Sequence, residues 1–352
     1  MRMRGKVTIM DVAAAAGVSH QTVSRVINNG PNVSVKAREK VEVAVAKLGY
    51  SPSLAARRMG GSKSFLLLAL NDRDRTIEGW RLREGIDWID QMLFGGMLTC
   101  AEHGYRLIFE LVDTHSDQIE RELTSALDAL RPDGVILTPP HSDNPQILQV
   151  LEREQIPAAR IGGFAATGGI VIRMDDRAAA IETVEYLAGL GHCRIAFIAG
   201  SPEYALSEQR LGGYHDAVAR LGLDADPALV QTGDFSPESG EAAARQLLAL
   251  PHPPTAIIAS GDQMALAALS VAQDQGLVVP DDLSLVSFDG TPIVRMSTPP
   301  LTSINQPVAE LTARAAKVLV DPNGELAQAA RRGPIVVPYS LEVRGSTTSP
   351  RR

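Results

Sequence analysis

Short apolar runs alternate with amphipathic stretches over most of the chain, from about residue 62 to residue 345. A short apolar run between polar residues is typical of a buried parallel strand, and apolar positions three and four residues apart are typical of a helix. The apolar runs are 65–70, 107–111, 134–137, 170–172, 195–199, 256–259 and 283–288, and the helical stretches include 117–130, 177–190, 209–221, 237–250 and 263–275. The alternation occurs twice, which predicts an α/β body of two doubly wound parallel-sheet subdomains with a ligand crevice at the strand ends.

The first 50 residues have helical periodicity only, so the sequence predicts an all-α head. Ser19 is a good N-cap for a helix, and Gly17 just before it permits a tight turn. Val23, Val26 and Ile27 then form one apolar face. The opposite face carries His20, Gln21, Ser24, Arg25 and Asn28. These side chains hydrogen-bond base edges and phosphates, which indicates a helix that enters the DNA major groove.

Two further helices flank this one. Thr8 and Asp11 have the spacing of a capping box at the start of the preceding helix. The next helix is expected to begin at Ser34 and to end at Gly49, with a buried apolar stripe between them. Two helices joined by a short turn with glycine form a helix-turn-helix. A small helical bundle that binds nothing has the same pattern, so the pattern alone leaves that alternative open.

The charge distribution favours the DNA-binding interpretation. The whole chain has a formal net charge of −7, but residues 1–63 hold eleven Lys or Arg and three acidic residues, a net charge of +8. The remainder therefore carries −15. A basic head suits a polyanion, and an acidic body is repelled by it. The two parts of the chain are expected to have different partners.

The sequence lacks the motifs that membrane proteins, secreted proteins, metal-binding proteins and enzymes usually contain. No apolar run is long enough to span a bilayer and no secretion signal is present, so we expect a cytoplasmic protein without a membrane partner. Cys100 and Cys193 lack metal-ligand spacing and are expected to be two buried thiols. His141 has no partner at metal-ligand spacing either. No catalytic motif or cofactor fingerprint is found, so we expect no enzyme activity, no cofactor and no metal.

The head resembles the lactose/galactose-repressor (LacI/GalR) family. The resemblance rests on 7–13, 16–19, 22–26 and Asn28, and continues without gaps through Val33-Ser34 to Pro52. It implies a DNA-binding domain over residues 1–50 in which His20, Gln21 and Arg25 contact base edges. The other implied DNA contacts in this domain are Thr8, Ser19, Thr22, Ser24, Asn28, Ser34 and Tyr50.

Residues 51–61 correspond to the hinge helix of that family. In the family, two paired hinge helices insert an apolar wedge, usually Leu, into the minor groove. Met59 stands at the wedge position here, and Ala56 and Arg57 are the further DNA contacts that the resemblance implies. Ser53 replaces the usual Asn. A plain linker remains the alternative for this segment.

The body, residues 62–345, resembles the effector-binding core of the same family, which has the periplasmic-binding-protein architecture. The resemblance implies that the chain crosses between subdomains near residues 175, 291 and 333. The N-subdomain is then expected to comprise about 62–175 and 292–333, and the C-subdomain about 176–291 and 334–345. Residues 346–352 are expected to form a flexible tail.

The resemblance also implies an effector site between the subdomains. Arg210 and Asp289 match the two most regular sugar contacts of the family, and their chemistry suits vicinal hydroxyl groups. The other candidate effector contacts are Asp176, Phe235, Asp262, Pro139 and Trp80. For Asp176, Phe235 and Asp262, a salt bridge or a core position is an equally good interpretation. Pro139 follows a strand end and is expected at the cleft rim.

Two segments depart from the family pattern. Gly261 stands where the family usually has Asn, so one hydrogen bond to a sugar is missing or comes from another group. Residues 72–94 are longer than is usual after the first strand and contain Trp80, Trp88 and Phe94. These aromatic residues either line the cleft or pack on their own subdomain.

The leading hypothesis is a sugar-responsive transcriptional repressor that binds a pseudo-palindromic operator as a homodimer and is released by its effector. No C-terminal heptad repeat predicts a tetramer. The dimer is expected to pair through side helices that include 93–98 and 264–271, and the same periodicity also fits faces that are buried in the core. A regulator with a purine-like corepressor is the alternative, and a solute-binding protein without a DNA role is a weaker one because it needs an export signal.

Overall fold

The computed structural model describes residues 7–27, 30, 32–50, 63–83, 85–165 and 168–351. The chain forms two compact units, Met1–Phe65 and Leu66–Arg352, and each is described by itself. Four of the expected DNA contacts, Asn28, Ala56, Arg57 and Met59, lie outside the described residues, as does the hinge segment.

The first unit contains the three expected helices, α1 (Ile9–Ala16), α2 (His20–Ile27) and α3 (Val35–Leu48). The predicted capping box is present, because the Thr8 and Asp11 side chains each accept a hydrogen bond from the other residue's backbone N–H. Ser19 and Ser34 cap the next two helices. The helices enclose a small core of Val12, Ala13, Ala16, Val23, Val26, Val41 and Ala44.

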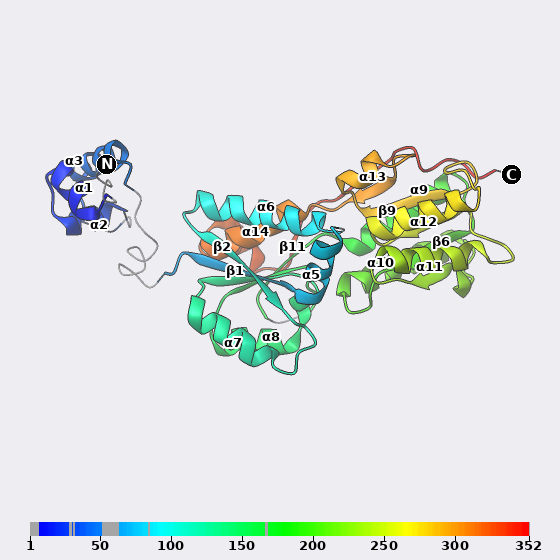
Figure 1. Cartoon of the computed structure of the whole chain (residues 1–352), viewed down its shortest axis with the longest axis horizontal. Coiled ribbons are helices and arrows are strands. Elements are labelled where there is room, and N and C mark those ends of the chain that lie inside the picture. Colours follow the sequence, from blue (N-terminus) through cyan, green and yellow to red (C-terminus); the bar gives the residue numbers. More distant parts are fainter. Residues whose placement is uncertain are drawn as a thin grey trace. The chain divides into compact units, whose positions relative to one another are not determined.

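The second unit contains two six-stranded sheets, which confirms the predicted fold class (Figure 1). The first sheet has the order β11-β5-β4-β3-β1-β2 and the second β12-β10-β9-β8-β6-β7. All the strand pairs are parallel except β10 with β12. The first sheet comprises β1 (Leu66–Asp72), β2 (Arg106–Val112), β3 (Gly134–Leu137), β4 (Ala158–Ile161), β5 (Ile170–Arg173) and β11 (Ile335–Val336). The second comprises β6 (Ile195–Ala199), β7 (Val230–Thr232), β8 (Ala256–Ala259), β9 (Ser284–Asp289), β10 (Thr302–Asn305) and β12 (Ser340–Glu342).

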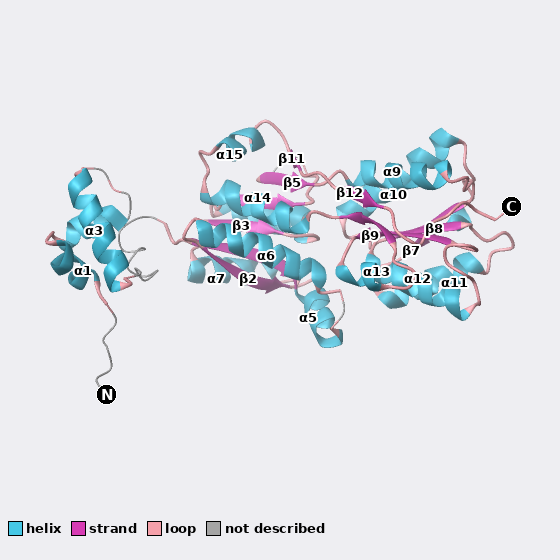
Figure 2. Cartoon of the chain, turned by 90° about the horizontal axis from the view of Figure 1, so that it is seen from above, coloured by secondary structure: helices cyan, strands magenta, loops and turns pink. Residues whose placement is uncertain are grey.

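Helices cover both faces of each sheet (Figures 1 and 2). The first subdomain has α5 (Arg73–Leu82), α6 (Asp87–Glu102), α7 (Ile119–Leu130), α8 (Pro145–Arg153), α14 (Val308–Val320) and α15 (Glu325–Ala330). The second has α9 (Asp176–Gly189), α10 (Ala205–Leu221), α11 (Pro237–Leu248), α12 (Asp262–Asp274) and α13 (Pro292–Met296). Among the described residues, no helix combines the length and apolar character that crossing a membrane requires.

Two of the three expected subdomain crossings are displaced. The first lies near residue 175, as predicted, between β5 and α9. The second does not lie near 291, because β10 pairs with β9 in the second sheet and the chain crosses only between β10 and α14. The third follows β11 rather than residue 333, since β11 pairs with β5 in the first sheet. The segment Thr302–Asn305 carries buried hydroxyl groups, and its polar composition concealed a strand.

The C-terminal segment is not a flexible tail. Ser346 is fully buried, and its hydroxyl accepts a hydrogen bond from the Thr302 N–H (2.8 Å) and donates one to the Leu285 carbonyl (2.6 Å). Thr348 bonds the imidazole of the buried His192 through its carbonyl oxygen. These contacts fasten residues 346–348 along the second sheet.

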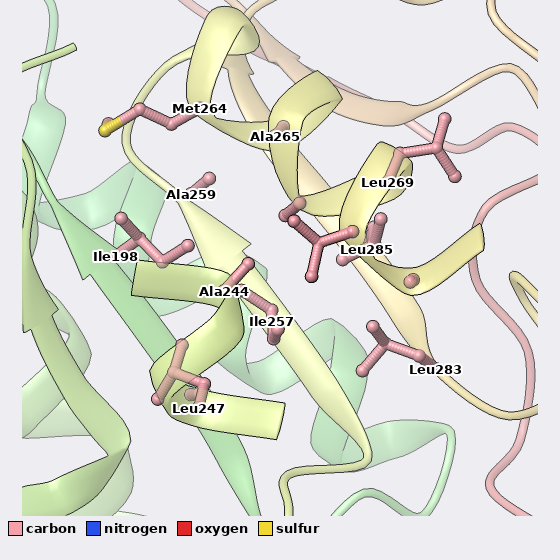
Figure 3. Packing of buried hydrophobic residues seen from close by; sticks show 14 of the residues in the cluster. Ile198, Ala244, Leu247, Ile257, Ala259, Met264, Ala265, Leu269, Leu283 and Leu285 are labelled. Carbon is pink, nitrogen blue, oxygen red and sulfur yellow. The ribbon is translucent and has the colours of Figure 1, made fainter. Parts of the chain in front are cut away.

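Two expectations about apolar surface need correction. Met264, Ala265 and Leu269 are buried in the core cluster that includes residues of α11, α12 and strands β6, β8 and β9, so 264–271 is not an exposed pairing face (Figure 3). Cys100 is buried as expected, but Cys193 is exposed. The apolar pattern of the sequence identifies apolar segments but does not show whether the protein core, a second copy or solvent lies against a given residue.

Candidate functional site

A cleft between the two subdomains collects residues from the carboxyl ends of several strands, where open α/β sheets bind their ligands. Asp72 ends β1, Pro139 follows β3, Gly261 follows β8 and Asp289 ends β9. The lining also includes Asn71, Arg75, Thr76, Glu78, Gly79, Leu82, Trp88, Ile89, Tyr204, Leu206, Arg210, Phe235, Ser236, Pro237, Glu238, Gln263 and Gln306. Four of the candidate effector contacts therefore line one cleft: Arg210, Asp289, Phe235 and Pro139.

Arg210 lines this cleft and has one terminal nitrogen without a hydrogen-bond partner among the described residues. It lies on α10 with 1% of its surface exposed, and its Nε donates to Asp176 Oδ1 at 2.8 Å. Its Nη1 donates to the Ser260 carbonyl at 2.6 Å, and the guanidinium lies 4.5 Å from the centre of the Phe288 ring. Nη2 is buried without a hydrogen-bond partner among the described residues. Because an unpaired buried N–H is costly, this geometry suits a ligand acceptor at Nη2.

Asp176 is placed differently from the expectation. It does not line the cleft but lies beneath Arg210, 4% exposed, where it compensates the buried guanidinium charge. Burial raises the pKa of Asp176, and the Arg210 charge acts in the opposite direction. Its role in the structure is to hold and orient Arg210.

Asp289 and Asp262 form a pair of neighbouring carboxyl groups at the end of β9 and the start of α12. Asp289 Oδ2 accepts from the Asp262 N–H at 3.1 Å, and Oδ1 accepts from Gln306 Nε2. Asp262 Oδ2 accepts from the Thr291 N–H at 2.7 Å. Burial, and then the charge of Asp289, raises the pKa of Asp262 to about 7, and burial raises the pKa of Asp289. Asp262 lines a second, neighbouring cavity rather than the cleft itself.

Phe235 forms an aromatic wall with Tyr204, whose ring centre lies 5.3 Å away in an edge-to-face arrangement. Phe235 has a φ of +72° and Asp289 a φ of +100°, backbone conformations that are costly for residues other than glycine and that cluster at functional sites. A Cβ atom at Gly261 would lie 3.3 Å from the Phe235 ring and 3.4 Å from Asp289 Oδ2. Glycine at this position therefore leaves the Phe235 ring and the Asp289 carboxylate accessible together.

Residues 72–94 contain α5 and the start of α6 (Figure 1). Of the two expectations for this segment, lining the cleft and packing on its own subdomain, each holds for part of it. Arg75, Gly79 and Leu82 recur on one face of α5 and line the cleft. Trp80 lies outside the cleft lining, tilted against Phe109 at 5.9 Å between ring centres, so the structure does not bring it together with the other candidate contacts. Trp88 lines the cleft instead.

Sequence reasoning missed other cleft residues. Arg75, Tyr204 and Gln306 line the cleft, but none was a candidate. Arg75 lies within segment 72–94, and the unusual length of this segment was the sequence feature that could have pointed to Arg75. Tyr204 lies in the loop between β6 and α10. A search of all loops that follow strands would have found it.

The α2 helix presents the expected recognition face. His20, Gln21 and Arg25 are exposed, while Val23 and Val26 are buried in the head core. Ser19 Oγ accepts from the Thr22 N–H at 3.2 Å and bonds Thr22 Oγ1 at 2.9 Å, so these two residues form the helix start. Thr8 and Ser34 are likewise occupied as caps, and Tyr50 packs against the core. Ser24 is half-buried on the same helix.

Comparisons with known proteins agree with both parts of the chain. Residues 8–53 match the family model for bacterial regulatory proteins of the lacI family, and residues 184–347 match the periplasmic binding protein-like domain. The HTH-type transcriptional repressor CytR of Escherichia coli (strain K12) is 34% identical over 97% of this chain and 96% of its own length.

Two solved structures are similar over nearly the whole length. A complex of the transcriptional regulator CelR with cellobiose has a TM-score of 0.71 at 30% identity, covering 97% of this chain and 100% of the other. The lac repressor dimer bound to operator and the anti-inducer ONPF has a TM-score of 0.76 at 30% identity, covering 97% and 99%. The members of this family are DNA-binding transcriptional regulators and not enzymes. The chain belongs to the LacI family of bacterial regulatory proteins.

Proposed function

We propose that the protein is a transcriptional repressor that binds a pseudo-palindromic operator as a homodimer and is released by a sugar or glycoside in the cleft. The observation that carries the ligand assignment is the buried, unpartnered Nη2 of Arg210 beside the carboxyl group of Asp289. A fixed guanidinium donor and a carboxylate acceptor suit adjacent hydroxyl groups of one sugar ring.

The aromatic wall supports the same ligand class. Phe235 and Tyr204 offer ring faces and edges to the cleft, and Trp88 lines it from the other subdomain. Sugar rings have apolar faces that stack on aromatic side chains while their hydroxyls take the polar contacts. The CelR structure, a complex with cellobiose, is a relative with a carbohydrate ligand.

Ligand contacts from both subdomains give a route for the signal. The cleft has Arg75 and Trp88 on the first subdomain and Arg210 and Asp289 on the second. A ligand that contacts both stabilises one relative arrangement of the subdomains, and the two copies of the head are then held at a different spacing. Operator half-sites have a fixed spacing, so the change in arrangement weakens DNA binding.

A regulator with a planar, purine-like corepressor is the second candidate, and the aromatic wall is the observation that favours it. Phe235, Tyr204 and Trp88 suit a flat heterocycle as well as a sugar ring. The two candidates differ in the sign of coupling, because a corepressor strengthens operator binding and an inducer weakens it.

The first test measures operator binding with ligands present. Fluorescence anisotropy of a labelled operator is recorded with the full chain, first alone and then with neutral sugars, glycosides and nucleobases that raise its melting temperature. We expect a sugar or glycoside to weaken operator binding by about 10- to 100-fold, the usual range of allosteric coupling. Stronger operator binding with a nucleobase supports the corepressor instead. No effect of any stabilising ligand on operator binding contradicts the coupling that we propose.

The homodimer is proposed to form through an exposed apolar face of α6. Phe94, Met97 and Leu98 are 57%, 54% and 51% exposed at neighbouring positions of one helix face. A second copy covers such a face in an isologous interface, and the solved lac repressor relative is a dimer.

Replacing Phe94 and Leu98 by glutamate together tests this interface. We expect the variant to sediment near the chain mass of 37.6 kDa, in contrast to the wild type near twice that mass, because two buried charges oppose the association. Val343→Glu, at an apolar residue that is 57% exposed elsewhere, is the matched control. A double variant that remains dimeric places the interface on another face.

A further inference from the structure

Helix α5 is anchored as a wall of the effector cleft. Asp72 Oδ1 caps it by accepting from the Arg75 N–H at 2.8 Å, and Arg73 Nη2 forms an ion pair with Asp113 Oδ2 at 2.6 Å. Thr76 is 4% exposed, and Trp80 packs against Phe109 on β2. The side chains on the cleft face of α5 are therefore held by a fixed backbone.

Arg75 reaches from this wall to the opposite subdomain. Its Nη1 donates to the Asp234 carbonyl oxygen at 2.7 Å. Its guanidinium carbon lies 5.2 Å from the ring centre of Phe235 and 5.9 Å from that of Tyr204. The guanidinium thus occupies the cleft beside the aromatic wall, in the range of cation–π attraction.

The Arg75 charge has no carboxylate partner at ion-pair distance among the described residues, in contrast to its neighbour Arg73. One carbonyl oxygen and two ring faces account for its contacts, although a guanidinium has five N–H donors. Arg75 is also exposed to solvent in the cleft. Several donors therefore remain for a ligand, in the fork geometry that matches carboxylate and phosphate.

The carboxylates of the inner cleft each accept hydrogen bonds from neighbouring residues of the protein. Asp72 accepts from the Arg75 N–H and from Thr114 Oγ1, and Asp289 accepts from Gln306 and the Asp262 N–H. Glu78 and Glu238 line the cleft with exposed side chains. Arg75 and Nη2 of Arg210 add unused hydrogen-bond donors to these acceptors.

We propose that Arg75 is a specificity-determining residue that binds an anionic group of the effector, a carboxylate or a phosphate on a sugar. The inference rests on the proposed function, because it assigns the class of sugar for the same cleft. The ring of the ligand lies toward Arg210 and Asp289, and its anionic group lies at the α5 wall between Arg75 and the aromatic side chains.

The experiment compares matched ligands by isothermal calorimetry on the full chain. The probes are glucose, galactose and cellobiose, the uronic acids of the two monosaccharides with cellobionate, and the two hexose 6-phosphates. We expect wild-type protein to bind at least one acid at least about tenfold more tightly than its neutral parent. The uronate and 6-phosphate arms show whether the group is a carboxylate or a phosphate.

Arg75→Ala is expected to remove that preference and to leave the affinity for the neutral parent within about threefold, since an uncharged ligand lacks the charge-assisted bond. Arg81→Ala is the matched control, because Arg81 stands on the same helix and does not line the cleft. Arg75→Lys keeps the charge without the fork, so it is expected to retain part of the preference. Operator affinity without ligand is measured for each variant, and Arg81→Ala is expected to leave it unchanged.

The possible failures are distinguishable. If neutral sugars bind as tightly as their acids, or if Arg75→Ala keeps the preference for the acid, this inference is wrong and the sugar effector stands. If no probe of either kind binds while a nucleobase does, the proposed sugar effector fails and this inference fails with it. Equal loss of all ligands in Arg75→Ala shows that Arg75 closes the cleft rather than selecting the anion.

Discussion

Arg210→Lys is expected to abolish most of the effector response while operator binding without effector stays at the wild-type level. The lysine keeps a positive charge near Asp176 but loses Nη2, the guanidinium nitrogen that has no hydrogen-bond partner among the described residues. A hydrogen bond from a charged donor contributes about 1.5–3 kcal/mol, so effector affinity should fall by about 10- to 150-fold. Calorimetry with the effector and anisotropy with labelled operator measure the two affinities separately.

Lysine is a better probe here than alanine. Alanine leaves Asp176, which is 4% exposed, without its charge partner, and removal of one member of a buried ion pair costs about 3–5 kcal/mol. Arg210→Ala should therefore unfold at a lower temperature than Arg210→Lys, and Arg210→Ala/Asp176→Asn should recover part of the loss. A lysine variant that responds to effector as the wild type does would remove Arg210 from the effector site. Lost operator binding with intact folding would assign Arg210 to the coupling between the units.

The fold was largely predictable because local patterns agree with the tertiary arrangement. Ser19, Ser34 and Gly49 mark helix ends through their own chemistry, and the continuous apolar runs are strands buried on both faces. The strands that were missed are short or polar. Thr302–Asn305 is an internal strand between β9 and β12, and its Thr302 bonds Ser346 and Thr347 of the C-terminal segment; no local periodicity contains that long-range information.

The candidate site was predictable only in part. Asp289 ends a strand and Arg210 lies within α10, both carry ordinary site chemistry, and the structure brings them to one cleft. Asp176 has the same chemistry, but its carboxylate binds and orients Arg210. This contact exists because α9 packs against α10, and the sequence pattern does not show that packing. Trp80 and Arg75 stand on one helix, and only the tertiary position of α5 shows which of the two faces the cleft.

Gln21→Ala is expected to change which operator bases are preferred without changing the fold of the head. Gln21 is exposed on α2, whereas the helix start is capped by Ser19 and its apolar face is Val23 and Val26. A bidentate contact between Gln and adenine contributes about 1–3 kcal/mol of discrimination. Affinity for the best operator should therefore fall by about 10- to 100-fold, with relaxed preference at one base pair of each half-site. Selection from a randomised operator library, followed by anisotropy on the selected sequences, measures both.

The dependence on salt separates base reading from phosphate binding in the same experiment. Gln21 is uncharged, so its replacement should leave the slope of log affinity against log salt unchanged. Arg25, which is exposed on the same helix, is the matched comparison. If Arg25 contacts a phosphate, Arg25→Ala should weaken all sequences alike and reduce the slope by about one. An unchanged base preference in Gln21→Ala would contradict the assignment of this helix face to the major groove. A Gln21 that contacts a phosphate or faces solvent does not read the base sequence.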